Sequence, residues 1–267
     1  MDMNLPLIEP AILQPVETSR ALETRALTVS YRGTVRLRNV RAIFPRHRVT
    51  AILGPSGCGK STFLRALNRT LEIVPGARVE CGSVLLDGHK IYGKGTAASW
   101  VRTHIGMLQQ KPAPFPMSIL DNVVFGARYH GLARDLVDSA RHYLERVGLW
   151  DEVKDRLKAP ALTLSGGQQQ RLCLARTLAV KPSIVLMDEP CSALDPRATA
   201  VIEGLIRELA CDYTIVIVTH NIAQARRVAD YCVFLLDGEV VSDGTREEIL
   251  INPRHPTVRD FVTGLVG

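Results

Sequence analysis

The feature that most constrains the fold is a glycine-rich segment that directly follows a short apolar run. Residues 49–53 (VTAIL) have the composition of a buried strand, and residues 54–61 (GPSGCGKS) match the pattern G-x-x-x-x-G-K-[ST] at every defined position. A helix is expected to follow over residues 62–71. In this context backbone N–H groups can surround phosphate oxygens, and the helix N-terminus adds partial positive charge. The sequence therefore predicts a nucleotide phosphate site rather than a turn that only begins a helix.

The residues of this loop have different expected roles. Lys60 would neutralise the β- and γ-phosphate oxygens, and Ser61 would be a ligand of Mg²⁺. Cys58 is interpreted as a small side chain that fits the turn rather than as a redox group. The residues expected to contact the nucleotide here are Gly54, Pro55, Ser56, Gly57, Cys58, Gly59, Lys60, Ser61 and Thr62.

A second apolar run is followed by two carboxylates. Residues 184–187 (IVLM) resemble a buried strand, and Asp188 and Glu189 come directly after them. Open α/β sheets bind ligands at the carboxyl ends of their strands. Asp188 would hold Mg²⁺ there, and Glu189 would act as a general base toward the attacking water. Since acidic pairs are also common at the start of solvated loops, this interpretation depends on the phosphate loop.

Alternating strands and helices predict a parallel sheet. Apolar runs over 183–188 and 214–219 flank a helix-like pattern over 202–209, which is typical of crossover connections. Asp-Gly pairs at 87–88 and 237–238 each follow Leu-Leu and predict β-hairpins.

Residues 112–164 are predicted to form a helical insert. Ser118 is a suitable N-cap for a helix over 119–129, and a further helical face is formed by Leu136, Ala140, Tyr143, Leu144 and Val147.

Residues 164–168 (LSGGQ) resemble the signature motif of ABC ATPases. Other landmarks of that family occur in the expected order within residues 24–267, namely Tyr31, Gln110, Asp188, Glu189, Ser192–Asp195 and His220. The resemblance implies an α/β fold with a P-loop NTPase (RecA-like) core, an antiparallel β subdomain and an inserted α-helical subdomain. It also implies that the nucleotide is ATP, with Mg²⁺.

The resemblance also implies roles for single residues. Tyr31 would stack on adenine, Gln110 would touch Mg²⁺ or the attacking water, His220 would contact the γ-phosphate, and Asp195 would couple two sites. A helix beginning at Ser165 offers a second phosphate-binding surface. In the family, this signature closes on ATP held by another subunit, which implies a head-to-tail homodimer. The expected catalytic residues are Lys60, Gln110, Glu189 and His220. The residues expected to bind Mg²⁺ are Ser61, Gln110 and Asp188. The signature residues expected to contact the nucleotide are Ser165, Gly166, Gly167 and Gln168.

Segments outside the shared motifs are similar to one branch of the family, the ATPase of the high-affinity phosphate importer. They are residues 68–69, 74–79, 111–119, 164–171, 190–196, 218–221 and 260–264. The branch implies two transmembrane permease subunits, an indirect partnership with a solute-binding protein, and a peripheral position on the cytoplasmic face of the plasma membrane. Import of another solute, such as an amino acid or a different anion, is the near alternative.

Composition and length weigh against other classes. No run approaches the roughly 18 apolar residues of a membrane helix, and the net charge of +6 arises from residues scattered among 27 acidic ones, so no nucleic-acid partner is expected. Residues 1–22 are predicted to be a flexible leader, and residues 23–267 a single ATPase domain. A soluble repair or translation ATPase would require a long coiled-coil insertion or tandem cassettes, and a P-loop kinase would not require residues 164–168.

Overall fold

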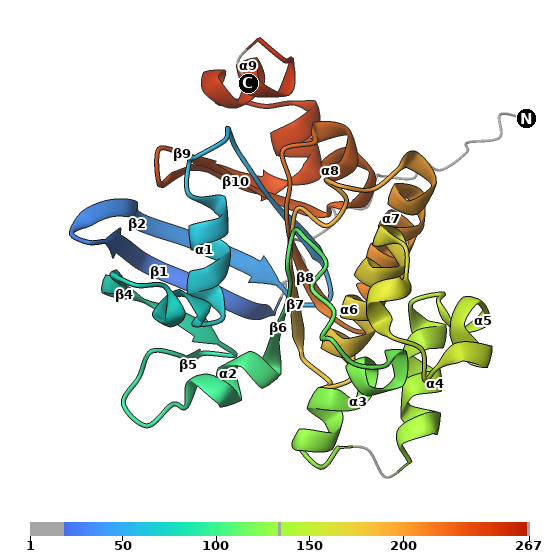
Figure 1. Cartoon of the computed structure of the whole chain (residues 1–267). Coiled ribbons are helices and arrows are strands. Elements are labelled where there is room, and N and C mark those ends of the chain that lie inside the picture. Colours follow the sequence, from blue (N-terminus) through green and yellow to red (C-terminus); the bar gives the residue numbers. More distant parts are fainter. Residues whose placement is uncertain (1–18, 133–134, 266–267) are drawn as a thin grey trace, which may run out of the picture.

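Two β-sheets form the framework of the computed structural model, which describes residues 19–132 and 135–265 (Figure 1). The first sheet is antiparallel, and its strands lie in the order β2 (Thr34–Pro45), β1 (Arg20–Tyr31), β4 (Ala77–Leu86) and β5 (His89–Lys90). The second sheet has the order β10 (Glu239–Thr245), β9 (Tyr231–Leu236), β3 (Val49–Leu53), β8 (Thr214–Val218), β7 (Ile184–Asp188) and β6 (Ile105–Leu108). It is parallel from β9 to β6, as the sequence predicts, and β10 is its antiparallel edge.

The parallel strands are apolar throughout because both of their faces are buried. In β3, Ala51 and Leu53 contribute to one hydrophobic core while Ile52 contributes to the other. The first core packs against helices that include α6 and α7, and the second packs against α1 and the antiparallel sheet. Each fully buried aliphatic side chain contributes about 1.5–3 kcal/mol, so these strands hold the loops at their carboxyl ends on a rigid base.

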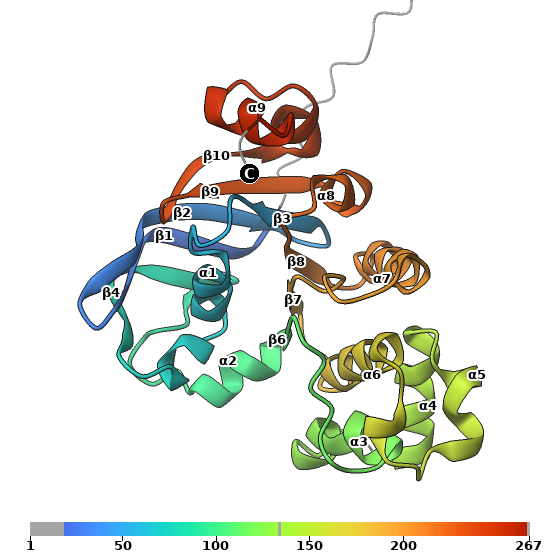
Figure 2. The ribbon, with the colours of Figure 1, turned by 45° about the horizontal axis from the view of Figure 1, so that its top comes forward.

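The helices divide between the sheets and a separate helical region (Figure 2). α3, α4, α5 and α6 gather on one side, and α6 packs against α3 and α4. The helical region therefore continues past residue 164, where the predicted insert ended. The helices are α1 (Lys60–Leu67), α2 (Ala98–His104), α3 (Ile119–Tyr129), α4 (Leu136–Arg146), α5 (Trp150–Val153), α6 (Gly166–Leu178), α7 (Pro196–Leu209), α8 (Ile222–Val228) and α9 (Pro256–Val262). Short 3₁₀ turns occur at η1 (Thr70–Ile73), η2 (Lys154–Arg156) and η3 (Ala161–Thr163), and η4 (Glu247–Ile251) is a π-helical turn.

Both predicted hairpins are confirmed. Asp87 and Gly88 have φ values of 48° and 80° in the turn between β4 and β5, and Asp237 and Gly238 have φ values of 47° and 81° between β9 and β10. Two successive positive φ values match the twist of the flanking strands, and glycine adopts them without strain. The predicted N-cap is also confirmed, since the Ser118 side chain accepts a hydrogen bond from the Asp121 N–H.

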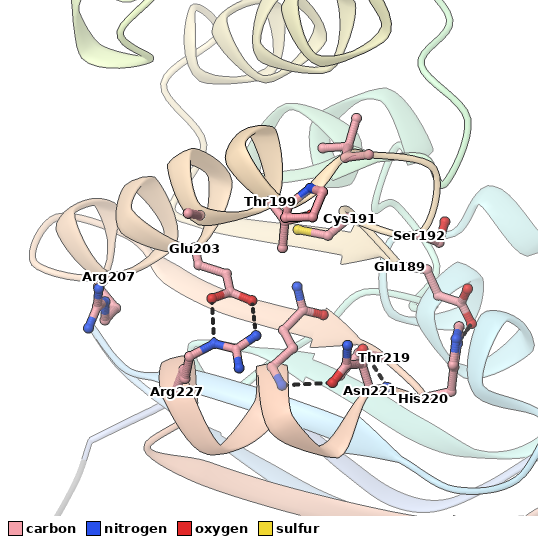
Figure 3. Close-up of a pocket in the computed structure, with 14 residues that line it drawn as sticks. Glu189, Cys191, Ser192, Thr199, Glu203, Arg207, Thr219, His220, Asn221 and Arg227 are labelled. Atoms are coloured by element: carbon pink, nitrogen blue, oxygen red, sulfur yellow. Dashed lines mark hydrogen bonds and ion pairs between the residues drawn. The ribbon is translucent and has the colours of Figure 1, made fainter.

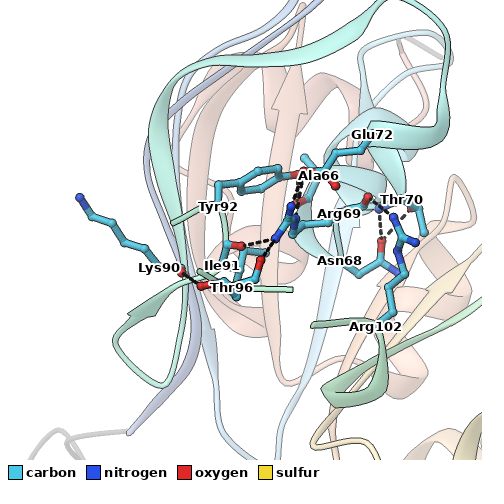
Figure 4. Close-up of polar contacts among 10 residues, drawn as sticks. All are labelled: Ala66, Asn68, Arg69, Thr70, Glu72, Lys90, Ile91, Tyr92, Thr96 and Arg102. Carbon is cyan, nitrogen blue, oxygen red and sulfur yellow. Dashed lines mark hydrogen bonds and ion pairs between the residues drawn. The ribbon is translucent and has the colours of Figure 1, made fainter. Parts of the chain in front are cut away.

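The helix after the phosphate loop is shorter than the predicted range of 62–71. It ends at Leu67 because Asn68 Oδ1 accepts hydrogen bonds from the N–H and hydroxyl of Thr70, and Arg69 adopts a left-handed conformation with φ 62° (Figure 4). The Arg69 guanidinium then donates to the carbonyls of Ile91 and Thr96 at 3.0 and 2.6 Å. The end of α1 is thereby fixed to the chain that leaves the antiparallel sheet.

The start of the first strand differs from the predicted domain boundary. β1 begins at Arg20, so residues 20–22 belong to the antiparallel sheet, and residues 1–18 of the predicted leader lie outside the described residues. Within the described ranges, no helix combines the length and the hydrophobicity that crossing a membrane requires.

Candidate functional site

The predicted phosphate loop lies between β3 and α1 and depends on glycine. Gly54 has φ 144°, and a Cβ atom there would lie 2.0 Å from the Leu235 carbonyl oxygen. Gly59 has φ 110°, and its Cβ would lie 2.9 Å from a methyl group of Leu37. Because neither position accepts a side chain, the loop stays narrow and its backbone remains open to a ligand at the N-terminus of α1.

Lys60 begins α1 and its side chain turns back over the loop. Its Nζ donates to the carbonyl oxygens of Gly54 at 2.7 Å and Pro55 at 2.8 Å, and the residue is only 7% exposed. Burial raises the pKa of the neighbouring Cys58 thiol, although the Lys60 charge opposes this shift, so the thiol is neutral near pH 7. The Lys60 ammonium is therefore held against the loop by two backbone carbonyl oxygens.

Ser61 and Asp188 bring two oxygen atoms together beside the loop. Ser61 Oγ donates to Asp188 Oδ1 at 3.2 Å, and Asp188 is buried at the end of β7. Burial raises the pKa of the Asp188 carboxyl, which the Ser61 hydrogen bond partly opposes. No cluster of three or more His, Cys, Asp or Glu side chains that could hold a metal occurs in residues 19–132 and 135–265. The oxygen pair fits Mg²⁺, which commonly takes few protein ligands and completes its shell with phosphate and water.

Glu189 lies at the centre of a second polar group. Its Oε2 accepts a hydrogen bond from Gln110 Nε2 at 2.9 Å, and its Oε1 lies 3.0 Å from His220 Nδ1. The Glu189 backbone has φ 45° and is held by its N–H, which donates to the Val218 carbonyl at 2.9 Å. A left-handed conformation costs a residue other than glycine about 1–2 kcal/mol. The fold thus maintains a strained backbone that directs this carboxylate toward Gln110 and His220.

A pocket of about 750 Å³ extends away from Glu189 and His220 between α7 and α8 (Figure 3). Its wall includes the ion pair of Glu203 and Arg227, with both N–O distances at 2.7 Å. Burial raises the pKa of the Cys191 thiol in the same wall to about 11. Cys191 is therefore a neutral packing residue and not a nucleophile at physiological pH.

Two further predicted residues, Tyr31 and Asp195, lie outside these two groups. The Tyr31 hydroxyl accepts a hydrogen bond from Thr62 Oγ1 at 3.4 Å, which places this tyrosine beside the start of α1. The Asp195 carboxylate caps α7 by accepting from the N–H groups of Arg197 and Ala198, and these bonds hold its pKa below the ordinary value.

The signature segment lies at the start of α6, in the helical region. Ser165 and Gln168 form a reciprocal capping box at the start of α6, and the Gln168 amide also donates to Glu152 at 2.7 Å. Since α6 and α1 pack against opposite faces of the parallel sheet, the chain does not bring its own signature onto its own phosphate loop.

Two residues near Glu189 were not predicted as site residues. Ser192 accepts a hydrogen bond from Gln110 at 3.3 Å. Gln170 is only 1% exposed and bonds the backbone next to Gln110 and Glu189. Gln170 precedes Leu174 by four residues and Leu178 by eight, so helical periodicity alone would have indicated a polar side chain on a buried face.

Comparison with known proteins agrees with this geometry. The family model described as ABC transporter matches residues 37–192, which is more than half of the chain. The structure of cbiO1 from Clostridium perfringens, described as part of the ABC transporter complex cbiONQ, is 29% identical with a TM-score of 0.77, over 88% of this chain and 92% of that one. A bacterial Atm1-family ABC exporter with ATP bound shares the fold at 24% identity and a TM-score of 0.78, over 93% of this chain and 42% of that one. The predicted fold class is confirmed, and the chain belongs to the ABC transporter family as an ATP-binding domain with the ABC ATPase fold.

Proposed function

We propose that this chain is the ATPase subunit of an importer, most specifically one for inorganic phosphate. The observation that carries the ATPase proposal is the position of Glu189, whose carboxylate is held by Gln110 and His220 while the adjacent Asp188 contacts Ser61 of the phosphate loop. A base, an oxygen pair suited to Mg²⁺ and a phosphate loop lie at the carboxyl ends of β7 and β3, which flank β8 in the parallel sheet.

The arrangement supports hydrolysis by an activated water. Glu189 would accept a proton from a water that attacks the γ-phosphorus, and the bond from that phosphorus to the leaving oxygen of ADP breaks. Lys60 would leave the carbonyls of Gly54 and Pro55 and neutralise the phosphate oxygens. Mg²⁺, held by Ser61 and Asp188, would supply further neutralisation of the phosphates.

The separation of the signature from the phosphate loop supports a dimer. Because α6 and α1 lie on opposite faces of one sheet, the N-terminus of α6 is available to the ATP of a second copy. Head-to-tail pairing would use both surfaces of each chain and enclose two ATP molecules.

Ser165→Arg tests this pairing. The larger cationic side chain removes the N-cap and fills the space where the second subunit would present its γ-phosphate, so we expect ATPase activity to fall by about 10²-fold while ATP binding stays within about twofold. Hydrolysis and equilibrium binding of ATP are measured on the same purified protein. Loss of ATP affinity instead of turnover would place Ser165 at the chain's own nucleotide and contradict the dimer.

An exposed aromatic patch supports a membrane partner. We define the patch by Phe115, Phe125 and Tyr129, which are 36%, 42% and 82% exposed, and the rings of Phe115 and Phe125 meet edge to face at 5.0 Å. Exposed apolar patches indicate interaction sites. Only residues 111–114 separate Gln110 from this patch, so a permease docked there could respond to changes at Glu189. The assignment to a separate ATPase subunit draws on cbiO1, a chain of similar extent that is part of the cbiONQ complex.

The phosphate assignment rests on the branch-like segments of the sequence. Among them, residues 68–69 end α1 and fix it to residues 91–96, while residues 111–119 form the turn between Gln110 and α3. In that turn the Asn122 amide binds the N–H and the carbonyl of Phe115, at 2.7 and 3.1 Å. The second of these segments includes Phe115 of the aromatic patch, where the permease would dock. An importer for another solute, including an amino acid or a different anion, remains the alternative.

Uptake of labelled phosphate at low external concentration tests the substrate. Cells that depend on this system are compared with cells that carry Glu189→Gln, and we expect ATP-dependent uptake to be lost in the variant. Unchanged phosphate uptake, together with lost ATPase activity of the purified variant, would leave the ATPase standing and reject phosphate as the solute.

A further inference from the structure

The buried glutamine on α6 lies between the two loops that carry Gln110 and Glu189. Gln170 Nε2 lies 3.4 Å from the carbonyl oxygen of Gln109 and 3.3 Å from that of Pro190. One of these residues immediately precedes Gln110, and the other immediately follows Glu189. Both partners are carbonyl oxygens, which only accept, so the NH₂ group of the amide must face them.

Strand pairing explains why a side chain is needed at this point. β6 and β7 are parallel neighbours whose pairing extends to Leu108 and Met187. The ladder between β6 and β7 ends at these residues, and Pro190 has no N–H with which to continue it. The Gln170 amide supplies one N–H to each chain, so it joins the two loops where the backbone no longer can.

The other two adjacent glutamines contact different parts of the chain. Gln168 completes the capping box with Ser165, and Gln169 donates to the Leu164 carbonyl at 2.8 Å. Of these three glutamines, only Gln170 reaches the loops that follow β6 and β7, among the residues that the structure describes.

The contacts of Gln170 are not those expected of a side chain that serves only the stability of the folded protein. Its Oε1 is buried and has no hydrogen-bond partner among the described residues, an arrangement that destabilises a folded protein. Both donor distances exceed the typical 2.9–3.0 Å, so either loop can approach the amide further.

We propose that Gln170 is a positioning residue that fixes the spacing of Gln110 and Glu189 and transmits to them any movement of α6. The proposal rests on the proposed function, since it requires hydrolysis at Glu189. Ser165 caps the same helix five residues earlier, about 7.5 Å along the axis, so a contact of Ser165 with a second subunit's ATP would reach this chain's own catalytic pair through Gln170.

Gln170→Met tests the proposal because methionine keeps the length of the side chain and removes both donors and the unpartnered oxygen. We expect kcat for ATP hydrolysis to fall by about 10- to 100-fold, since small displacements of catalytic groups have effects of this size. The KM for ATP should stay within about twofold, and the thermal midpoint should not fall. Gln170→Glu, which replaces the donating NH₂ with an acceptor, should lower kcat at least as far.

Thr177→Val is the matched control on the same helix, because the only hydrogen bond of its hydroxyl among the described residues is to the Cys173 carbonyl within α6. Wild type and Glu189→Gln are assayed in parallel. Hydrolysis by Gln170→Met at the wild-type rate overturns the positioning role alone, and so does a lowered thermal midpoint with a raised KM, which would indicate a merely structural residue. No hydrolysis by the wild type overturns the proposed function, and this inference with it.

Discussion

Glu189→Gln is expected to lower the rate of ATP hydrolysis by about 10²- to 10⁴-fold while leaving ATP affinity nearly unchanged. An amide cannot accept the proton of the attacking water. It does keep the shape of the carboxylate, so it can retain one of the contacts with Gln110 at 2.9 Å and His220 at 3.0 Å. The Lys60 and Ser61 groups that would bind phosphate and Mg²⁺ are untouched. Phosphate release at saturating Mg-ATP and equilibrium titration with ATP measure the two effects separately.

The same variant reports on subunit association. If hydrolysis reopens the dimer, ATP that binds without being hydrolysed should hold it closed, so the variant should sediment as a dimer with ATP and as a monomer without it. Glu208→Gln, an exposed substitution on α7, is the control and should behave as the wild type. A Glu189→Gln protein that hydrolyses ATP at the wild-type rate, or stays monomeric at saturating ATP, would contradict the role of general base.

The framework around this site could be predicted because its signals are local. The apolar run VTAIL is followed directly by Gly54, and β3 occupies the predicted residues 49–53. The Asp-Gly pairs specify their hairpins through the backbone angles of two residues. The glycine-rich loop is likewise recognised from its own sequence, although the atoms that exclude a Cβ at Gly54 and Gly59 belong to the distant Leu235 and Leu37.

The end of α1 was not predictable in the same way. Residues 68–71 continue an acceptable helical sequence, but Asn68 bonds to Thr70 and Arg69 to carbonyls more than twenty residues away. Those distant contacts outweigh the modest preference of the chain for another helical turn. The same applies to α6, whose membership in the helical region depends on packing against α3 and α4.

The site likewise has a part that local sequence predicts and a part that only the folded chain brings together. Asp188 and Glu189 could be proposed from a strand pattern, whereas the contact of Glu189 with Gln110 joins residues 79 positions apart. Gln170 reaches Gln109 and Pro190 across 61 and 20 positions. No local pattern encodes these pairings, because they follow from the order of strands in the sheet.

Lys60→Ala is expected to abolish measurable ATP turnover, with a loss of at least about 10²- to 10³-fold. Lys60 Nζ would neutralise the γ-phosphate, and its hydrogen bonds among the described residues go to the loop carbonyls of Gly54 and Pro55 and, at 3.9 Å, to the Cys58 sulfur. Lys60 forms no ion pair within 4.0 Å among residues 19–132 and 135–265. ATPase assays and thermal unfolding with and without Mg-ATP measure the outcome.

Thermal unfolding distinguishes loss of ligand binding from loss of fold. A buried ammonium without a paired carboxylate is costly, so removal of Lys60 should leave the thermal midpoint without nucleotide unchanged or higher. Wild-type protein should gain about 2.7 kcal/mol at a ligand concentration 100 times its Kd, and the variant should lose most of that gain because it binds Mg-ATP poorly. Lys90→Ala, an exposed change on β5, should retain both the activity and the gain in stability.

Lys60→Arg keeps the charge, but its planar guanidinium does not fit a loop built around a compact ammonium, so this variant should also be inactive. If Lys60→Ala hydrolysed ATP normally, residues 54–61 would not be the phosphate site.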